Sequence, residues 1–265
     1  MLYFVGTPIG NLKDVSYRAI ETLSNVDIIA CEDTRHSQVF LNHYNIKKPL
    51  ISYHKFNEKE CAQTIIKHLE DGKDLAVISD AGMPIISDPG GVLIQSLIQK
   101  GLEWTVIPGA CAFVPAMILS GLDCSKFCFI GFLPEKIKDI QKLLENYISV
   151  EAPLIFYVAP HDIDTTVKNL YEVFGDRKAV AVREITKIYE ERIEFNLSDG
   201  YNGEKRGEFV LIVDGAKAQE CMDVDPVKQV ENYMALGLSK MDAIKKTAKE
   251  RNMKKNDLYK LFIND

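Results

Sequence analysis

The sequence predicts an α/β protein with two α/β domains and a small helical C-terminal module. Short runs rich in β-branched and aromatic residues alternate with amphipathic stretches from the first residues onward, which is the pattern of repeated βαβ units. The runs of the first half are apolar almost throughout, and this indicates a largely parallel sheet covered on both faces. After Gly215 the pattern becomes helical. We therefore expect domains at residues 1–121 and 122–215, followed by the module at residues 216–265.

In the first domain, each expected strand is followed by a helical pattern, as a parallel sheet requires. These strands are expected at residues 2–6, 26–32, 75–80 and 104–109. The strands of the second domain are expected at residues 126–132, 152–158, 179–185, 189–196 and 207–215, with a helix near 163–174. Because no long helix separates the last three, some of the pairing there is expected to be antiparallel. A small-molecule site is expected in the cleft between the two domains.

The C-terminal module differs from the rest of the chain in charge. From Pro226 to Asp265 it carries nine Lys and Arg against five Asp and Glu, a net charge of +4. Because the whole chain has a net charge of −6, the first 225 residues have a net charge of −10. Ser239 and Asp242 are spaced as a helix-capping box, and Asn256 is a candidate cap of a last helix. The basic residues favour an RNA-docking function, although a solvated face that packs on the body or on a second subunit would have the same pattern. The expected RNA-binding lysines of the module are Lys245, Lys246, Lys254 and Lys255.

Composition excludes several classes of protein. The chain has 265 residues, 46% hydrophobic and 26% charged, as is usual for a globular protein. Without an apolar run of membrane-spanning length or a signal-peptide pattern, we expect a cytoplasmic protein with no membrane partner. The six cysteines and five histidines show no metal-ligand spacing, so we expect reduced thiols and no metal site.

Three loops carry the composition of a ligand site. GTPIGN (6–11) follows the first strand, SDAGMPIISDPGG (79–91) follows another, and IPGACA (107–112) ends in small residues at the start of a helix. Loops at the carboxyl ends of strands hold ligands in open α/β sheets, and glycines let a ligand approach the backbone closely. A P-loop and a dinucleotide fingerprint are both absent from them. Cys111 is either a nucleophile or a buried small residue, and the second interpretation is favoured because no His is evidently paired with it.

Two polar clusters are candidates for acid–base chemistry. One is CEDTRH (31–36), which contains Glu32, Asp33 and Arg35; the other contains Arg183, Glu184 and Lys187. The carboxylates are suited to remove a proton, and the cations are suited to bind phosphate. Charged residues at strand ends also occur for solvation alone, so the sequence does not rank them.

These loops and clusters, together with several further segments, occur in an order along the chain that matches a known family. They are VGTPIGNL (5–12), ACEDTRH (30–36), SDAGMPIISDPG (79–90), VIPGACA (106–112), FIGFLP (129–134), VREITK (182–187), KRGEFVLIV (205–213) and KKNDLY (254–259). Together they resemble the small-subunit ribosomal RNA methyltransferase I family, a branch of the tetrapyrrole methylase superfamily, also called class III methyltransferases. The resemblance covers nearly the whole chain. It implies two α/β domains that hold S-adenosylmethionine in the cleft between them, mainly through backbone groups.

The resemblance also implies which residues bind the cofactor. The matching positions are Pro8, Asp80, Ala81, Gly82, Met83, Pro84, Gly109, Ala110, Cys111, Ala112, Tyr157 and Val158. Met83 stands where the family usually has threonine, and Ala110-Cys111 stand where Pro-Ser is common. These departures weaken any requirement for a side-chain hydroxyl there, while backbone contacts would survive them.

The implied reaction is 2′-O-methylation of a cytidine ribose in small-subunit (16S) ribosomal RNA. The expected catalytic residues are Glu32, Asp33, Arg35 and Glu184, and Arg183 and Lys187 are expected to bind RNA phosphate. The implied partner is 16S ribosomal RNA or the small ribosomal subunit, and a homodimer is expected from the family. Two alternatives are a methyltransferase acting on a tetrapyrrole or other small molecule, and a non-catalytic RNA-binding protein. ACEDTRH and the basic module favour RNA.

Overall fold

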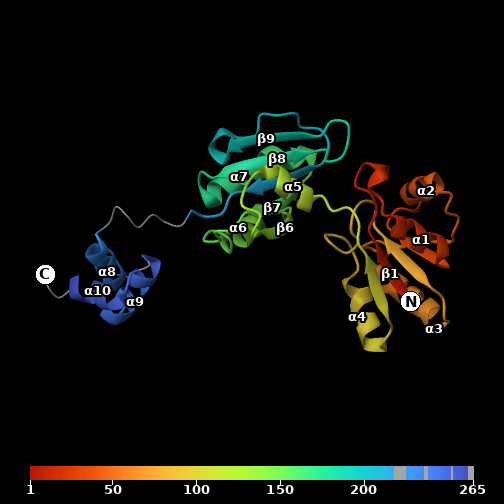
Figure 1. The fold of residues 1–265 in the computed structure, drawn as a ribbon, viewed down its shortest axis with the longest axis horizontal. Helices are drawn as coiled ribbons and strands as arrows, with labels where there is room; N and C mark the ends of the chain where they lie inside the picture. The colour runs from red at the N-terminus through yellow and green to blue at the C-terminus, as the bar shows by residue number, and fades with distance from the viewer. Residues whose placement is uncertain (218–224, 236–237, 252, 262–265) are drawn as a thin grey trace. The chain divides into compact units, whose positions relative to one another are not determined.

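The computed structural model describes residues 1–217, 225–235, 238–251 and 253–261. The chain forms two compact units, Met1–Gly215 and Ala216–Asp265, which are described separately (Figure 1). The first unit contains two five-stranded sheets, and the second is helical. None of the helices in the described ranges has both the length and the apolar character to cross a membrane.

The first sheet is wholly parallel, with the strand order β3-β2-β4-β1-β5. Its strands are β1 (Leu2–Val5), β2 (Ile28–Cys31), β3 (Leu50–Ser52), β4 (Leu75–Ile78) and β5 (Trp104–Ile107). One face packs on α3 (Glu58–Glu70) and α4 (Gly91–Lys100), and the other on α1 (Tyr17–Asn25) and α2 (Thr34–His43). The expectation of a parallel sheet covered on both faces is confirmed. Strand β3 was not predicted from the sequence.

The second sheet is mixed, with the order β6-β7-β10-β8-β9. Its strands are β6 (Cys128–Phe132), β7 (Leu154–Val158), β8 (Lys178–Arg183), β9 (Glu191–Asn196) and β10 (Phe209–Val213). Only β6 and β7 pair in parallel, and the other three pairings are antiparallel, as the missing helices predict. One face packs on α6 (Ile137–Glu145) and α7 (Ile163–Phe174). Short 3₁₀ helices lie at Leu12–Asp14, Pro160–Asp162 and Leu197–Asp199.

The helix α5 (Phe113–Ser120) covers the other face of the second sheet, although it follows the last strand of the first sheet in the chain. Its Ala116 and Met117 are buried against apolar residues of the second sheet, among them Val180 and Val210. The chain therefore passes from one sheet to the other at residues 108–112, before the helix rather than after it.

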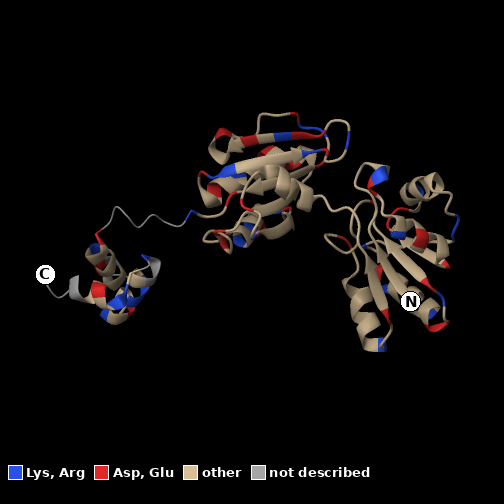
Figure 2. Ribbon diagram, viewed as in Figure 1, with Lys and Arg blue, Asp and Glu red and all other residues tan. Residues whose placement is uncertain are grey.

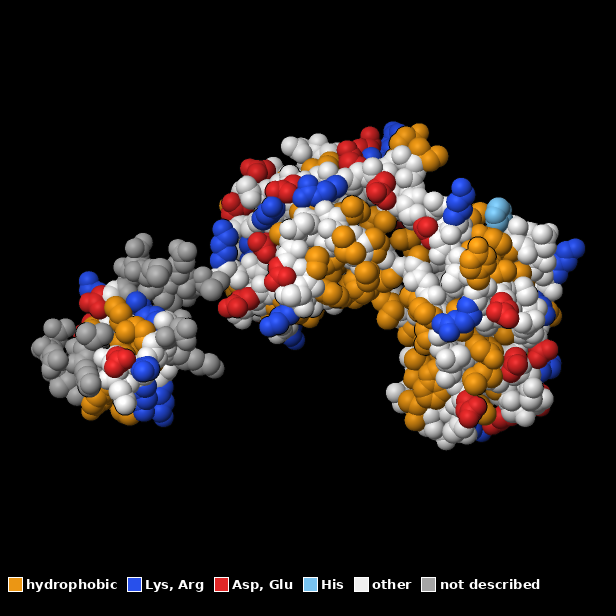
Figure 3. Space-filling model, in the orientation of Figure 1, with side chains coloured by type: hydrophobic (Ala, Val, Ile, Leu, Met, Phe, Trp, Pro, Cys, Tyr) orange, Lys and Arg blue, Asp and Glu red, His pale blue; other side chains and the backbone are white. Residues whose placement is uncertain are grey.

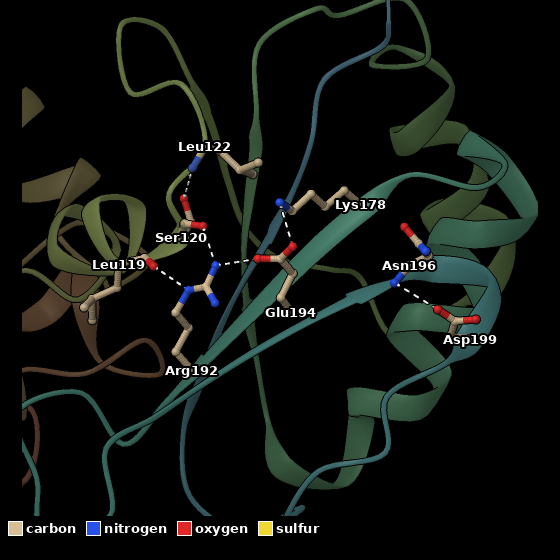
Figure 4. A network of polar contacts seen from close by, with 8 residues as sticks. All are labelled: Leu119, Ser120, Leu122, Lys178, Arg192, Glu194, Asn196 and Asp199. Atoms are coloured by element: carbon tan, nitrogen blue, oxygen red, sulfur yellow. Dashed lines mark hydrogen bonds and ion pairs between the residues drawn. The ribbon is translucent and has the colours of Figure 1, made fainter.

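Arg192 of β9 holds the carboxyl end of α5 in place (Figure 4). Its guanidinium donates to the carbonyl of Leu119 at 2.7 Å and to that of Ser120 at 3.0 Å. Glu194, which also pairs with Lys178, accepts from the same guanidinium at 2.6 Å. A cation at the end of a helix satisfies its last carbonyls and opposes the negative end of its dipole. Arg192 is thus a side-chain cap supplied by a neighbouring strand.

The C-terminal unit consists of α8 (Pro226–Ala235), α9 (Lys240–Glu250) and α10 (Lys255–Leu261) around a small core that includes Val230, Ile244 and Leu258. Ser239 caps α9, because Asp242 N–H donates to the Ser239 hydroxyl at 3.2 Å, and that hydroxyl donates to the Asp242 carboxylate at 2.7 Å. The prediction for Asn256 is wrong, since α10 begins at Lys255 and already contains it.

Candidate functional site

A cavity of about 420 Å³ lies where loops from both sheets of the first unit meet. This volume falls in the range of roughly 300–1,000 Å³ found for small-molecule sites. The loops after β1 and β4 and the start of α5 form one wall, and the end of β7 and the start of β10 form the other. The site therefore includes the carboxyl ends of the parallel strands, as the α/β pattern predicts.

Backbone hydrogen bonds between two loops fix the wall of this cavity. Thr7 N–H donates to the Gly82 carbonyl at 2.9 Å, and Gly82 N–H donates to the Thr7 carbonyl at 3.2 Å. Gly82 has a φ of +80°, a conformation that glycine adopts without strain. Because its N–H and carbonyl are already paired with Thr7, Gly82 contributes shape rather than free hydrogen-bonding groups.

Eight of the twelve residues expected to bind cofactor line the cavity. They are Asp80, Ala81, Gly82, Met83, Cys111, Ala112, Tyr157 and Val158. Pro8 instead lines a neighbouring cavity. Pro84, Gly109 and Ala110 are not in either lining.

The backbone of Gly109 packs directly against the backbone of Gly6, so no ligand can lie against Gly109 at this point. A Cβ added at Gly109 would lie 2.8 Å from backbone atoms of Gly6, far inside the normal contact distance. The glycines at these two strand ends let the loops after β1 and β5 touch, and this contact places Cys111 and Ala112 at the cavity. Burial raises the pKa of the Cys111 thiol, which keeps it protonated and argues against a nucleophile.

Three carboxyl groups line one part of the cavity, from Glu32, Asp80 and Asp88. Burial, together with the neighbouring Glu32 and Asp80 carboxylates, raises the pKa of Asp88 to about 6. Burial and the Asp80 carboxylate also raise the pKa of Glu32. Like charges in a partly desolvated site disfavour ionisation of each other. The result is a pair of carboxyl groups that exchange protons closer to neutral pH than ordinary side chains do.

Asp88, which the sequence analysis did not select, is presented by an unusual loop. Ile85 and Ser87 both have positive φ, +76° and +70°, which costs energy for residues with a Cβ. The Glu58 carboxylate of α3 accepts from Gly90 N–H at 2.9 Å and from Val92 N–H at 3.2 Å. It thereby caps α4, whose own N-cap residue is the glycine Gly90. A capping carboxylate from another helix holds the strained loop and fixes the position of Asp88.

Of the first polar cluster, only Glu32 faces the cavity. Asp33 caps α2, because its carboxylate accepts from Arg35 N–H at 2.8 Å. Hydrogen bonds from the backbone and side chain of Arg35 hold the pKa of Asp33 below its usual value. The Arg35 side chain is 92% exposed and is open to a partner outside the cavity.

In the second cluster, Lys187 faces the cavity and Glu184 holds it. The Lys187 ammonium lies 2.9 Å from the Glu184 carboxylate and 3.0 Å from that of Glu208. Burial would raise the pKa of Glu184, but hydrogen bonds from Glu208 N–H and Lys187 outweigh it and lower that pKa. An ionised, paired Glu184 orients Lys187 and is poorly suited to take a proton.

Two glycines make room for this pair. A Cβ added at Gly10 would lie 2.5 Å from Cγ of Lys187, and one added at Gly207 would lie 2.4 Å from Cγ of Glu184. Arg183 is not a free cation, since its guanidinium lies 2.9 Å from the Glu191 carboxylate and its side chain is 11% exposed. Arg183 therefore links β8 to β9 through its ion pair and stabilises the second sheet.

Of the four lysines expected to bind RNA in the C-terminal unit, Lys245 and Lys246 lie on α9, Lys255 begins α10 and Lys254 directly precedes it. Figure 2 shows Lys and Arg side chains (blue) on this unit. Lys245 lies 3.6 Å from the Asp242 carboxylate, and the Lys246 ammonium lies 4.2 Å from the centre of the Tyr233 ring. Lys254 is exposed and Lys255 is half-buried. They belong to a different unit from the cavity.

Comparison with known proteins assigns a class to this arrangement. A model of the family described as Tetrapyrrole (Corrin/Porphyrin) Methylases matches residues 1–199. The fold is similar to that of diphthine synthase, with a TM-score of 0.66 and 17% identity over 81% of this chain and 89% of that one. It is also similar to uroporphyrin-III C-methyl transferase from Thermus thermophilus in complex with S-adenyl homocysteine, with a TM-score of 0.57 and 15% identity over 80% and 96% of the two chains.

Sequence relatives narrow the class. A protein of Halalkalibacterium halodurans named ribosomal RNA small subunit methyltransferase I is 42% identical, over 98% of this chain and 94% of that protein. A Bacillus subtilis protein of the same name is 40% identical, over 99% and 94%. The chain therefore belongs to the tetrapyrrole methylase family and, within it, to the ribosomal RNA small subunit methyltransferases I.

Proposed function

We propose that this protein transfers a methyl group from S-adenosylmethionine to the 2′-oxygen of a cytidine ribose in 16S ribosomal RNA. The names of the relatives, at about 40% identity along the whole chain, support small-subunit ribosomal RNA as the acceptor. The cavity between the two sheets carries the cofactor assignment. We place the reaction in the cytoplasm, where this RNA is made.

The residues at the cavity fit the cofactor in size and charge. Ala81 and Ala112 leave space against the loops, while Ile9 and Tyr157 offer apolar surface for an adenine ring. The carboxylate wall suits a ligand with a positively charged sulfur and an ammonium group. We propose that the cofactor is held by the eight lining residues from the sequence prediction together with Ile185, Phe209 and Val210.

When bound, S-adenosylmethionine supplies a methyl group activated by its positive sulfur, so that a C–O bond forms as the C–S bond breaks. The protein must align the ribose hydroxyl and accept its proton. We assign the proton to Asp88, because its pKa, raised to about 6 by burial and by the Glu32 and Asp80 carboxylates, suits a base that works near neutral pH. Glu184 holds Lys187, and Asp33 holds Arg35, so both act as positioning residues.

The C-terminal unit is proposed to dock the RNA. Its lysines, with Arg35 on the first unit, would bind phosphates and leave the cofactor cavity free. Arg183, which is buried in its ion pair, is not part of this proposal.

A homodimer is proposed from an exposed apolar surface of the first unit. Val114 and Ile118 of α5 and Trp104 and Val106 of the edge strand β5 are exposed, and Figure 3 shows hydrophobic side chains gathered over α5 and over α4 and β5. Exposed apolar edges of this kind are usually covered by a partner. Sedimentation velocity tests this, because Ile118→Asp should yield monomers and a wild-type monomer would contradict it.

A methyl-transfer assay tests the function. Cofactor with a labelled methyl group is offered with free 16S ribosomal RNA, with assembled small subunits and with a tetrapyrrole. Label is expected in RNA, and nucleoside mass spectrometry should identify 2′-O-methylcytidine. Label in the tetrapyrrole alone would favour a small-molecule enzyme. RNA binding with no transfer to any acceptor would favour a non-catalytic RNA-binding protein.

A further inference from the structure

A second cavity, of about 340 Å³, adjoins the first. Both cavities are lined by Ile9, Asp80, Ala81, Lys187 and Glu208, which form a shared wall. The remaining lining of the second cavity comes from the loop after β1, from the end of β4 and from the first turns of α2, at Leu12, Ile78 and His36 among others. The volume exceeds what a few water molecules require and suits one nucleoside.

The chemistry of this second cavity is that of a nucleoside site rather than a second cofactor site. Pro8, Leu12 and Val39 give it apolar surfaces, and the His36 ring adds an aromatic one; bases of single-stranded RNA stack on such surfaces. Ser37 also lines it, and the buried Ser37 hydroxyl lies beside the Cys31 thiol.

The charged groups lie at the end of the cavity where a ribose would meet the methyl donor. Lys187, held between Glu184 and Glu208, belongs to the shared wall. Arg35, which lies 3.5 Å from the Asp33 carboxylate and whose side chain is 92% exposed, adds a cation on α2 next to His36. The polar groups are therefore arranged for a nucleotide whose base enters the cavity and whose phosphates remain outside.

We propose that the second cavity binds the acceptor nucleoside, with its base between the β1 loop and α2 and its ribose at the shared wall. The proposal rests on the methyl-transfer function proposed above and adds the location of the acceptor. Extrusion of a base into a pocket is the usual way in which enzymes reach an atom of a structured nucleic acid.

Val39→Trp tests the location. Val39 is 72% exposed on α2 at the rim of the cavity, so a larger side chain can be accommodated by the fold while it occupies the nucleoside space. We expect the KM for RNA, and the RNA dissociation constant measured by filter binding with S-adenosylhomocysteine present, to rise at least about tenfold. Affinity for S-adenosylmethionine, measured by calorimetry, should be unchanged.

The control is Ile137→Trp, which adds the same side chain to an exposed position of α6, 58% exposed and outside both cavities. Leu12→Trp, from the opposite wall, repeats the test if Val39→Trp is unstable. Unchanged RNA affinity and KM in Val39→Trp and Leu12→Trp, with normal turnover by the wild type, would overturn the nucleoside site and leave the methyl-transfer function intact. An equal loss of cofactor affinity would also overturn it. Absence of transfer by the wild-type protein would refute the function itself, and the nucleoside site with it.

Discussion

The carboxyl groups of the cofactor cavity show how single side chains set its chemistry. Asp88 lies beside Glu32 and Asp80, and one negative charge opposes the next. Such an acidic cluster suits a site that binds a positively charged cofactor and then accepts the proton of the hydroxyl that is methylated. The strained residues Ile85 and Ser87, held by the Glu58 cap, keep this cluster together.

The raised pKa of Asp88 has a defined consequence for stability. The group ionises with a pKa of 3.8 in a model compound and about 6 in the folded protein. Between these values the folded protein retains a proton that the unfolded chain has lost. The contribution of Asp88 to the free energy of unfolding is therefore present below about pH 4 and is lost as the pH rises through about 6. Above that pH the ionised group opposes folding.

Asp88→Asn separates the two effects of this carboxyl group. Because the amide cannot take a proton, the rate of methyl transfer is expected to fall about 100-fold or more, and the rise of the rate with pH near 6 should be lost. The free energy of unfolding at pH 7.5 should stay equal or increase by about 1 kcal/mol, since a buried charge is removed. Stopped assays over pH 5–9 and urea unfolding measure both. Asp139→Asn, on α6, is the control. A wild-type rate with a wild-type pH profile in Asp88→Asn would exclude Asp88 as proton acceptor.

Residues of this kind show where sequence reasoning stops. Glu32 and the SDAGMP loop were predicted because the strand pattern places them at the carboxyl edge of a parallel sheet. Asp88 was not selected, and α4 is capped by Glu58, whose carboxylate accepts from Gly90 N–H although it lies 32 residues earlier in the chain. Local patterns cannot indicate a capping group that comes from another helix. Likewise, the ion pair that buries Arg183 depends on the register between β8 and β9.

The helices and strands of this protein were predicted well where the runs of apolar residues were long. The four strands expected in the first domain and the mixed second sheet were found, because continuous apolar runs and missing helices are strong signals. Strand β3 spans only Leu50–Ser52 at the edge of its sheet, which is too short to show a period. The destination of α5 was also not predictable, since an apolar helix can pack on either of two sheets.

Arg192 offers a test of how α5 is held. Arg192→Ala leaves the carbonyls of Leu119 and Ser120 without their guanidinium partner and is expected to lower the free energy of unfolding by about 1–2 kcal/mol. Because α5 begins at the cavity, cofactor affinity should fall as well. Arg192→Lys should restore part of the stability.

Arg206→Ala is the matched control for Arg192→Ala, since the Arg206 side chain is 90% exposed and lies 3.8 Å from the Glu204 carboxylate. Unfolding by denaturant and calorimetric cofactor titration give both quantities. Equal stability of Arg192→Ala and the wild type would show that α5 is held by its apolar face alone.

At the scale of the whole molecule, charge is divided between the two units. The first 225 residues are acidic and the last 40 are basic, so RNA has a reason to approach the C-terminal unit first. An acidic body also discourages nonspecific binding of nucleic acid to the rest of the surface. Docking and chemistry are thereby assigned to separate parts of the chain.

Charge reversal at Lys254 and Lys255 tests this division. Lys254→Glu with Lys255→Glu should weaken RNA binding and reduce the slope of log affinity against log salt by about 1–2, because fewer counterions are released. Affinity for S-adenosylmethionine should not change. The control is Lys138→Glu with Lys142→Glu on α6, which makes the same change of net charge elsewhere. If both double variants had the same salt slope as the wild type, the C-terminal unit would not be the docking site.

The passage of α5 to the second sheet has a consequence for how the protein is made. During synthesis the chain emerges from its N-terminus, so α5 leaves the ribosome before β7, β8 and β10, the strands that bury Ala116 and Met117. For that interval the nascent chain presents an apolar helix with nothing to pack on, a state prone to aggregation. A chain cut after Gly121 would remain in it permanently. The second sheet is therefore covered on one face by a helix that is synthesised before it, so the second half of the first unit depends on a segment that precedes it in the chain.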